Sequence, residues 1–276
     1  MADPAVASIP KSTTGRPALD VATELVKRAG AIALEHFHRE KTVSSKGWAN
    51  LVTNVDMQVE QETKASLLKE FPGFGILSEE SAEIKTTSAY QWVLDPIDGT
   101  RNYAYGLPHF AVNLALVERG EVLIGLTYDA YRNELFSAVK GGGTYLNGQP
   151  RQCSTRKTVE ESLLGTDMGY KNLLAKHLWE LVLSLWPRAQ GVRVMGSAAL
   201  GLAYAAVGRT DLYIHHDLAP WDLASGLLLV REAGGVITDK NGGPVTIFNR
   251  GVIATNQAIL ADFLARTKGQ PWRNET

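Results

Sequence analysis

The stretch LDPIDGT at residues 94–100 is the most informative part of the chain. Asp95 and Asp98 lie three residues apart on either side of a proline, and a Gly-Thr pair follows them directly. The overlapping QWVL is short, apolar and aromatic-rich, which predicts a buried strand. Pro96 has no N–H group for strand pairing, so we expect the strand to end there and the two acids to lie in a turn.

Two carboxylates this close repel each other unless a positive charge lies between them. A hard divalent cation such as Mg²⁺, bound by oxygen ligands, removes that repulsion, and the amides of Gly99 and Thr100 can face an anion. The alternative is a turn without a metal, because Asp-Pro and Asp-Gly are common turn dipeptides. The heptapeptide alone leaves both interpretations open.

The composition is that of an ordinary soluble globular protein. The chain has 276 residues, of which 45% are apolar and 21% charged, and its size suits one large domain or two closely joined ones. The net charge of −1 gives no electrostatic basis for a nucleic-acid or membrane partner. The single cysteine, Cys153, excludes an internal disulfide. Without a membrane-length apolar run or a secretory signal, we expect a cytoplasmic protein.

Helical and strand patterns alternate along the chain, which predicts an α/β fold of packed layers. Helical periodicity covers residues 19–37 and 56–71, and an antiparallel meander over 109–146 ends at the strong hairpin signal Asn147-Gly148. The second half alternates strands at 162–166, 192–194, 211–214 and 236–238 with helices at 173–186, 197–207 and 221–233. We expect a flexible tail over 1–18, an N-terminal α+β half over 19–150 carrying most metal ligands, and a C-terminal α/β half over 151–276 completing the site.

Four segments place polar residues where the predicted structure changes type. Glu79 and Glu80 follow a short strand, and the aspartates of the heptapeptide follow the next strand. Ser197 is a good helix N-cap, and Asp222 lies in the first turn of another helix. Each has an ordinary explanation as a cap or a solvated corner. Together, however, they are typical of α/β proteins whose sites are built from loops at strand ends.

Carboxylates beside open helix N-termini indicate a site for magnesium and phosphate. Carboxylates position the ions, which lower the pKa of a bound water, and helix N-termini hold phosphate oxygens. The chain has no GxxxxGK[ST] loop for a nucleotide and no HExxH or paired CxxC for zinc. The adjacent pair His215-His216 points its side chains differently on a strand, which makes a poor metal site.

The motifs DPIDGT and NYAYGLPHFAVNLAL, with EES upstream and WDLASGLLLVREAGGVITD downstream, resemble the inositol monophosphatase family. The resemblance extends from about Leu19 to a final helix near Leu264. It implies a layered α-β-α-β-α sandwich of the sugar phosphatase type, often dimeric, so we expect a homodimer. It also implies a Mg²⁺-dependent, lithium-sensitive phosphomonoesterase with two or three ions per site and a small-molecule phosphate ester as substrate.

The resemblance assigns roles to individual residues. Glu79, Asp95 and the carbonyl of Ile97 match ligands of one metal, and Asp95, Asp98 and Asp222 match ligands of a second. Thr100 matches the residue that hydrogen-bonds the attacking water, and it forms the predicted catalytic set with Glu79, Asp98 and Asn50. The predicted substrate-binding set is Asp98, Gly99, Thr100, Gly196, Ser197, Ala198, His215 and Asp222.

One departure from the family pattern concerns water activation. In NLVTNVD the family usually has an aspartate at the first position, as partner of the threonine, and this chain has Asn50. An amide accepts a hydrogen bond but is a far weaker base than a carboxylate. We expect Asn50 to preserve the geometry and to reduce activation. The alternative is a neutral substitution, because the metal already lowers the pKa of the water.

Two further departures concern the substrate. Inositol-specific members carry a glutamate where this chain has His215, and a small serine near the position of Tyr170. Both changes alter the polar edge that selects a polyol. Inositol 1-phosphate is the first expected substrate, and fructose 1,6-bisphosphate, histidinol phosphate or another sugar phosphate remains an alternative. A regulatory member that binds a partner and has weak activity is a further alternative.

Overall fold

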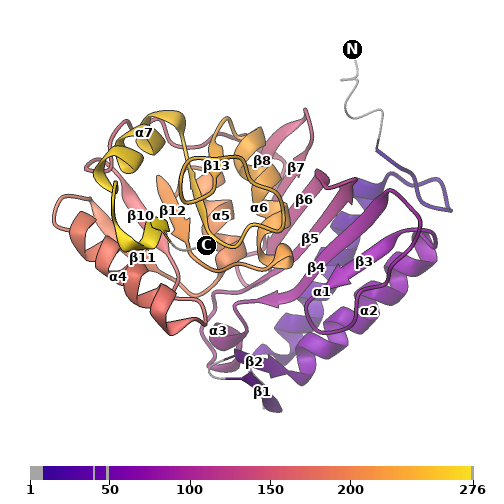
Figure 1. The fold of residues 1–276 in the computed structure, drawn as a ribbon. Helices are drawn as coiled ribbons and strands as arrows, with labels where there is room; N and C mark the ends of the chain where they lie inside the picture. Colours follow the sequence, from indigo (N-terminus) through magenta and orange to yellow (C-terminus); the bar gives the residue numbers. More distant parts are fainter. Residues whose placement is uncertain (1–8, 40, 48–49, 275–276) are drawn as a thin grey trace.

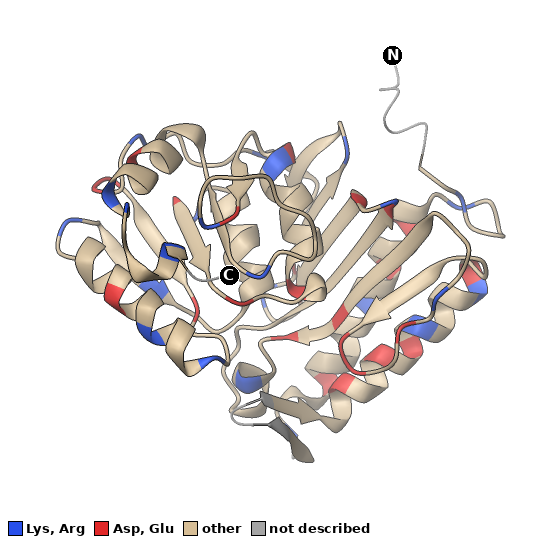
Figure 2. Ribbon diagram, viewed as in Figure 1, with Lys and Arg blue, Asp and Glu red and all other residues tan. Residues whose placement is uncertain are grey.

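The structure is a computed structural model that describes the backbone of residues 9–39, 41–47 and 50–274, and their side chains except at 46, 47 and 50. It is built of five layers, α-β-α-β-α, which confirms the predicted sandwich (Figure 1). Both signs of charge are distributed over the outer helices and loops (Figure 2). Among the described residues, none of the helices has the length and apolarity needed to cross a membrane.

The first two layers are a helix pair and a seven-stranded sheet. Helices α1 (Ala18–Phe37) and α2 (Asn54–Glu70) cover one face of the sheet. The strands follow one another in chain order, as β3 (Gly75–Ser78), β4 (Tyr90–Asp98), β5 (Ala111–Glu118), β6 (Glu121–Asp129), β7 (Glu134–Val139), β8 (Gly143–Leu146) and β9 (Gln149–Arg151). Neighbouring strands are antiparallel except for the parallel pair β3–β4.

The middle layer consists of α5 (Ala198–Ala206) and α6 (Pro220–Glu232), which pack against both sheets. The second sheet has the order β11-β10-β12-β14-β13, with β10 (Leu163–Thr166), β11 (Gly191–Val194), β12 (Leu212–His215), β13 (Val236–Thr238) and β14 (Val252–Thr255). Helices α4 (Asn172–Leu185), α7 (Gln257–Arg266) and α8 (Pro271–Asn274) form the last layer. The short helix α3 (Thr100–Ala104) and the hairpin of β1 (Val43–Gly47) and β2 (Asn50–Thr53) lie near the edge of the first sheet (Figure 1).

Three apolar cores fill the spaces between the layers, and one strand can contribute side chains to two of these cores. In β5, Val112 and Leu114 face α1 and α2, while Ala111 and Ala115 face α5 and α6. Because neighbouring side chains of a strand point to opposite faces, a strand buried on both faces is apolar throughout. The largely apolar run of residues 111–117, with Asn113 as its only polar residue, follows from this double burial.

Most predicted elements are present, with boundaries shifted by one or two residues, and Asn147-Gly148 forms the predicted turn with both φ angles positive, 49° and 75°. The short elements β1, β2, α3, β14 and α8 were not predicted. The proposed division at residue 150 falls within β9, and the division itself remains a prediction.

The N-terminal prediction needs correction in its described part. Residues 9–17 were expected to belong to a flexible tail, but they fold against the first layer. The amide of Thr13 donates to the carbonyl of Glu70 at 2.9 Å, and the amide of Ala18 donates to Pro10 at 3.0 Å. Ile9 packs against the core beneath α1 and α2. These backbone contacts, which a pattern of small and polar residues does not reveal, tie the segment to the end of α2.

The close approach of the middle layer to the first sheet gives a test of the packing. A Cβ atom on Gly125 of β6 would lie 2.8 Å from the backbone oxygen of Ser225 in α6. Because backbone cannot rotate away, Gly125→Ala should lower the free energy of unfolding by about 1–3 kcal/mol. Denaturant unfolding measures the change. Gly73→Ala is the matched control, because a Cβ there meets no atom within 4 Å, and equal stability of the two variants would contradict the packing.

Candidate active site

Three aspartates from distant parts of the sequence meet at one point. Asp95 and Asp98 lie at the end of β4, and Asp222 lies in the first turn of α6. One carboxylate oxygen of each falls within 4.8 Å of the others. Asp95 and Asp98 are buried, and Asp222 is partly exposed. The parallel pairing of β3 with β4, with Ser78 opposite Leu94, brings Glu79 to the same end of the sheet.

The turn at Pro96 has a shape different from the one predicted. Strand β4 does not end at the proline, because Asp95 pairs with Asn113 and pairing resumes between Asp98 and Ala111. The proline lies in the bulge between these two pairs, where no strand-pairing hydrogen bond is required, so its missing N–H costs no hydrogen bond of the sheet. This bulge keeps both aspartates on the sheet, and the amide of Ile97 donates to Asp95 Oδ1 at 3.1 Å.

Gly99 allows the end of β4 to pass close to α5. Its φ is +86°, and a Cβ atom there would lie 3.1 Å from the carbonyl oxygens of both Gly196 and His109. A larger residue would meet both the wrong backbone region and two backbone atoms. This close passage places Asp98 directly at the N-terminus of α5.

The N-terminus of α5 holds Asp98 in place. The amides of Ala198 and Ala199 donate to its two carboxylate oxygens at 3.2 and 3.1 Å, and the Ser197 hydroxyl donates to Oδ2. Ser197 also caps the helix by accepting from the amide of Leu200, as predicted for an N-cap. Ser197 therefore acts on the site through Asp98.

Asp222 is fixed by a polar network between α6 and the first sheet. Its Oδ2 accepts from the amide of Ala219 at 2.7 Å, at the start of the helix. The side chain of Asn113 donates to the carbonyl of Trp221, and Thr127 donates to Asn113 Oδ1 at 2.7 Å. This network anchors the helix start. Asn113 and Thr127 were not among the predicted residues, since one polar residue within an apolar strand has no distinctive pattern.

Thr100 contacts a carboxylate that we did not predict. Thr100 Oγ1 lies 3.3 Å from Asp56 Oδ1 and 2.9 Å from the carbonyl oxygen of Ile97. Asp56 is therefore a partner of Thr100 among the described side chains. The side chain of Asn50 lies outside the described residues, so the role that we expected for it remains a prediction. Because β2 ends at Thr53 and α2 begins directly after it, the start of the helix directs Asp56 toward Thr100. A buried carboxylate therefore contacts the Thr100 hydroxyl.

Asp56 caps helix α2 and also contacts Thr100, and its spacing in the sequence indicates only the first of these roles. It completes a capping box with Thr53, whose amide donates to Asp56 Oδ2 at 3.0 Å while its hydroxyl accepts from the amide of Asp56. Burial raises the pKa of Asp56, and the hydrogen bonds from Thr53 oppose that rise. The TxxD pattern predicts the cap, but it carries no sign of the contact with Thr100.

The aspartate cluster is electrostatically strained without a cation. Burial first, and then the charges of Glu79, Asp98 and Asp222, raise the pKa of Asp95 well above its ordinary value. Burial raises the pKa of Asp98 to about 7, Asp167 adds to the rise, and the hydrogen bond from Ser197 opposes it. Burial and the charge of Asp98 raise the pKa of Asp222. An all-oxygen donor set of this charge fits a hard divalent cation such as Mg²⁺.

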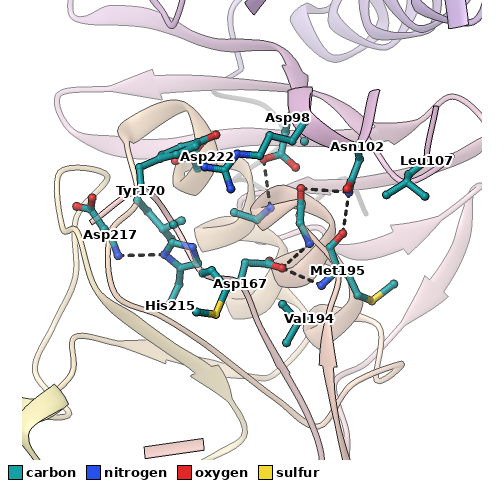
Figure 3. Close-up of a pocket in the computed structure, with 17 residues that line it drawn as sticks. Asp98, Asn102, Leu107, Asp167, Tyr170, Val194, Met195, His215, Asp217 and Asp222 are labelled. Atoms are coloured by element: carbon teal, nitrogen blue, oxygen red, sulfur yellow. Dashed lines mark hydrogen bonds between the residues drawn. The ribbon is translucent and has the colours of Figure 1, made fainter. Parts of the chain in front are cut away.

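A pocket of about 360 Å³ adjoins the cluster (Figure 3). Asp98 and Asp222 form its border with the cluster. Residues of α3, of the segments after β10 and β12, of the end of β11 and of the start of α5 line the rest. Asp167, at the end of β10, accepts from the amide of Met195 at 2.9 Å and from the Tyr213 hydroxyl at 2.8 Å. We did not predict Asp167, although its place after a strand matches the criterion that singled out Glu79.

The structure brings most of the predicted site residues to two adjoining cavities. Glu79, Asp95, Ile97, Asp98, Gly99, Thr100 and Asp222 line the cleft at the cluster. Gly196, Ala198 and His215 line the neighbouring pocket, together with Asp98, Gly99 and Asp222. Ser197 is buried and contacts Asp98. These positions agree in space with the roles assigned by resemblance, and the roles themselves remain predictions.

Comparison with known proteins gives a consistent result. The model of the inositol monophosphatase family matches residues 15–270. An inositol-1-monophosphatase of Rhizobium meliloti (strain 1021) is 38% identical over 246 residues, or 87% of this chain and 92% of that protein. The Nus factor SuhB of Escherichia coli (strain K12) is 37% identical over 258 residues, or 92% of this chain and 97% of that protein.

Solved structures agree with the sequence relatives. The extragenic suppressor protein suhB from Bartonella henselae superposes with a TM-score of 0.87 at 35% identity, covering 91% of this chain and 98% of that chain. An IMPase from Thermotoga maritima superposes with a TM-score of 0.83 at 32% identity, covering 90% of this chain and 95% of that chain.

The repulsion within the cluster predicts that removing one charge stabilises the folded protein, by an amount that depends on pH. The pKa values of these aspartates are higher in the folded state than the unfolded-state pKa of about 3.9. The cluster therefore contributes stability below a pH of about 3.9, and this contribution is lost as pH rises through about 7, the folded-state pKa of Asp98. Without Mg²⁺, Asp95→Asn should therefore raise the midpoint of thermal unfolding, with a gain that grows across this range. Thermal melts at several pH values measure it.

The control for this experiment is Glu62→Gln, which removes an exposed carboxylate of α2 that accepts a hydrogen bond from Gln58. It should show no comparable pH-dependent gain. Addition of Mg²⁺ should stabilise the wild type more than Asp95→Asn. A variant that is less stable than the wild type at every pH would contradict the strained cluster.

Proposed function

Because the chain belongs to the inositol monophosphatase family, we propose that it hydrolyses small phosphate monoesters with Mg²⁺, with inositol 1-phosphate as the first substrate to test. The observation that carries this proposal is the meeting of Asp95, Asp98 and Asp222 beside a pocket large enough for a small ester. Glu79 and the carbonyl of Ile97 add oxygen donors that line the same cleft.

The acidic residues would hold the metal ions, and the turn would hold the phosphate. Asp95 and Asp98 from β4 and Asp222 from α6 approach the cleft from different elements, so their oxygens surround a common point. When bound, Mg²⁺ supplies positive charge to the phosphate oxygens and lowers the pKa of a water molecule. The amides of Gly99 and Thr100, at the start of α3, are candidates to donate to a phosphate oxygen.

Thr100 and Asp56 would orient the attacking water and receive its proton. The Thr100 hydroxyl is already hydrogen-bonded to Asp56 and faces the cleft lined by the acids. Burial raises the pKa of Asp56, which makes this carboxylate a stronger base than an exposed one. The pair would accept the proton as the water oxygen attacks phosphorus from the side opposite the leaving alcohol.

The family membership and the composition suggest where the chain acts, in what oligomeric state and with which class of partner. We infer that the chain acts in the cytoplasm, as a homodimer, on a small molecule rather than on nucleic acid or membrane. A second candidate function is that of a partner-binding regulatory member with weak activity, because several similar proteins are named Nus factor SuhB. Fructose 1,6-bisphosphate, histidinol phosphate and other sugar phosphates remain alternative substrates.

Phosphate release with and without Mg²⁺ tests the enzyme proposal directly. Wild-type protein should release phosphate from inositol 1-phosphate, or from another member of a panel with fructose 1,6-bisphosphate and histidinol phosphate, only when Mg²⁺ is present. Asp98→Asn should abolish this turnover and leave the fold intact, because the amide has the size of the carboxylate it replaces. Wild-type protein that releases phosphate from none of these esters would sink the enzyme proposal and favour the partner-binding one.

The role of Asp56 predicts a selective kinetic defect. Asp56→Asn should lower kcat by roughly 10²- to 10⁴-fold, the usual range for loss of a general base, with little change in Mg²⁺-induced thermal stabilisation. Thr100→Ser keeps the hydroxyl and should retain most of the activity. Asn50→Asp is the discriminating control. If Asp56 is the base, this control leaves kcat unchanged, whereas a clear rise would return the role to residue 50.

A further inference from the structure

The pocket beside the aspartate cluster has an apolar wall that the proposed chemistry does not use. Leu107, Tyr170 and Val194 line it while remaining 55%, 46% and 45% exposed. Met168, Met195 and Leu218 complete the wall. Large apolar side chains that are exposed together within a cleft mark a surface that a ligand covers. Figure 3 shows Leu107 and Val194 on the side of the pocket away from Asp217.

Three polar side chains of this pocket, those of Asp167, Asn102 and Asp217, already make hydrogen bonds or ion pairs within the protein. Asp167 accepts from the amides of Met195 and Gly196 and from the Tyr213 hydroxyl. The Asn102 amide group donates to the carbonyls of His109 and Met195 at 2.8 and 2.7 Å. The carboxylate of Asp217 pairs with Lys171 at 3.2 Å and with Arg250.

His215 offers little to a polyol either. Its Nδ1 accepts from the amide of Asp217 at 3.0 Å, which leaves Nε2 to carry the proton of the neutral ring. Burial, with the neighbouring His216, lowers the pKa of His215 to about 3, so the ring is neutral at physiological pH. One neutral donor is a poor match for a ring of hydroxyl groups, which need acceptors as well as donors.

Tyr170 is held as a flat surface between the two cavities. Its ring lines both the cluster cleft and the pocket, and the Arg101 guanidinium lies 4.6 Å from the ring centre. This cation–π contact joins α3 to the segment after β10 across the site. An alcohol bound at the pocket would meet the face or edge of this ring next to the reacting phosphate.

We propose that this pocket binds the alcohol part of the ester and selects alcohols with an apolar or aromatic face over polyols, with Tyr170 as the specificity-determining residue. The proposal rests on the phosphatase function proposed above. A polyol entering the pocket would lose hydrogen bonds to water and find few partners. An apolar ring would cover Leu107, Tyr170 and Val194 and release water from them.

A pair of matched esters tests the preference. Cyclohexyl phosphate and inositol 1-phosphate share a six-membered ring and differ in hydroxyl groups. The proposal expects a kcat/KM ratio that favours cyclohexyl phosphate, and Tyr170→Ser should shift this ratio toward inositol 1-phosphate by roughly tenfold, the scale of one altered pocket contact. Comparing the ratio between variants cancels the difference in leaving-group chemistry. Val194→Thr, which keeps shape and adds a hydroxyl, should shift the ratio in the same direction.

A control variant and a binding measurement distinguish failure of the specificity proposal from failure of the phosphatase proposal. Tyr145→Ser, at a tyrosine on β8 that is 37% exposed, should leave the ratio unchanged. Calorimetric binding of the two non-hydrolysable phosphonate analogues in the presence of Mg²⁺ should show the same order of affinity. Binding in that order without turnover would support the pocket and overturn the phosphatase function. Turnover that favours inositol 1-phosphate, with a ratio unmoved by Tyr170→Ser, would overturn the specificity proposal alone.

Discussion

Mutual repulsion among Asp95, Asp98 and Asp222 is the constraint on which the rest of the site depends. Three carboxylates are held with oxygens within 4.8 Å of one another, in surroundings that raise their pKa values. Such a cluster persists only because neighbouring elements fix the position of each aspartate side chain. The amides at the start of α5 hold Asp98, the amide of Ala219 holds Asp222, and the bulge at Pro96 holds Asp95.

The five-layer fold supplies those restraints from both sheets. Strand β4 brings two aspartates from the first sheet, and the middle-layer helices bring their N-termini to the same point. Helix N-termini carry partial positive charge, which favours carboxylates there. The fold therefore stabilises the acids at the one place where a cation and a phosphate can use them. The same helix starts border the pocket for which we propose the alcohol part of an ester.

Sequence reasoning predicts the elements and the three aspartates because they lie in long, specific motifs at strand and helix ends. It misses residues that act through single contacts between distant parts of the chain. The position of the first turn of α2 determines that Asp56 contacts Thr100, 44 residues away in the sequence. Asp167 and Asn113 act through hydrogen bonds to backbone far away in the sequence. Such pairings leave no periodic trace in the chain.

The middle layer also links assembly of the core to assembly of the site. Helices α5 and α6 come from the second half of the chain, yet they cover the inner face of the first sheet. Until they dock, Ala111, Ala115 and Phe136 lie on an open apolar surface with exposed strand edges, a species prone to aggregate during synthesis. Docking closes that surface and delivers Asp222 in the same step. A chain in which α6 is not docked therefore lacks the third acid of the cluster, and completion of the core coincides with completion of the acidic cluster.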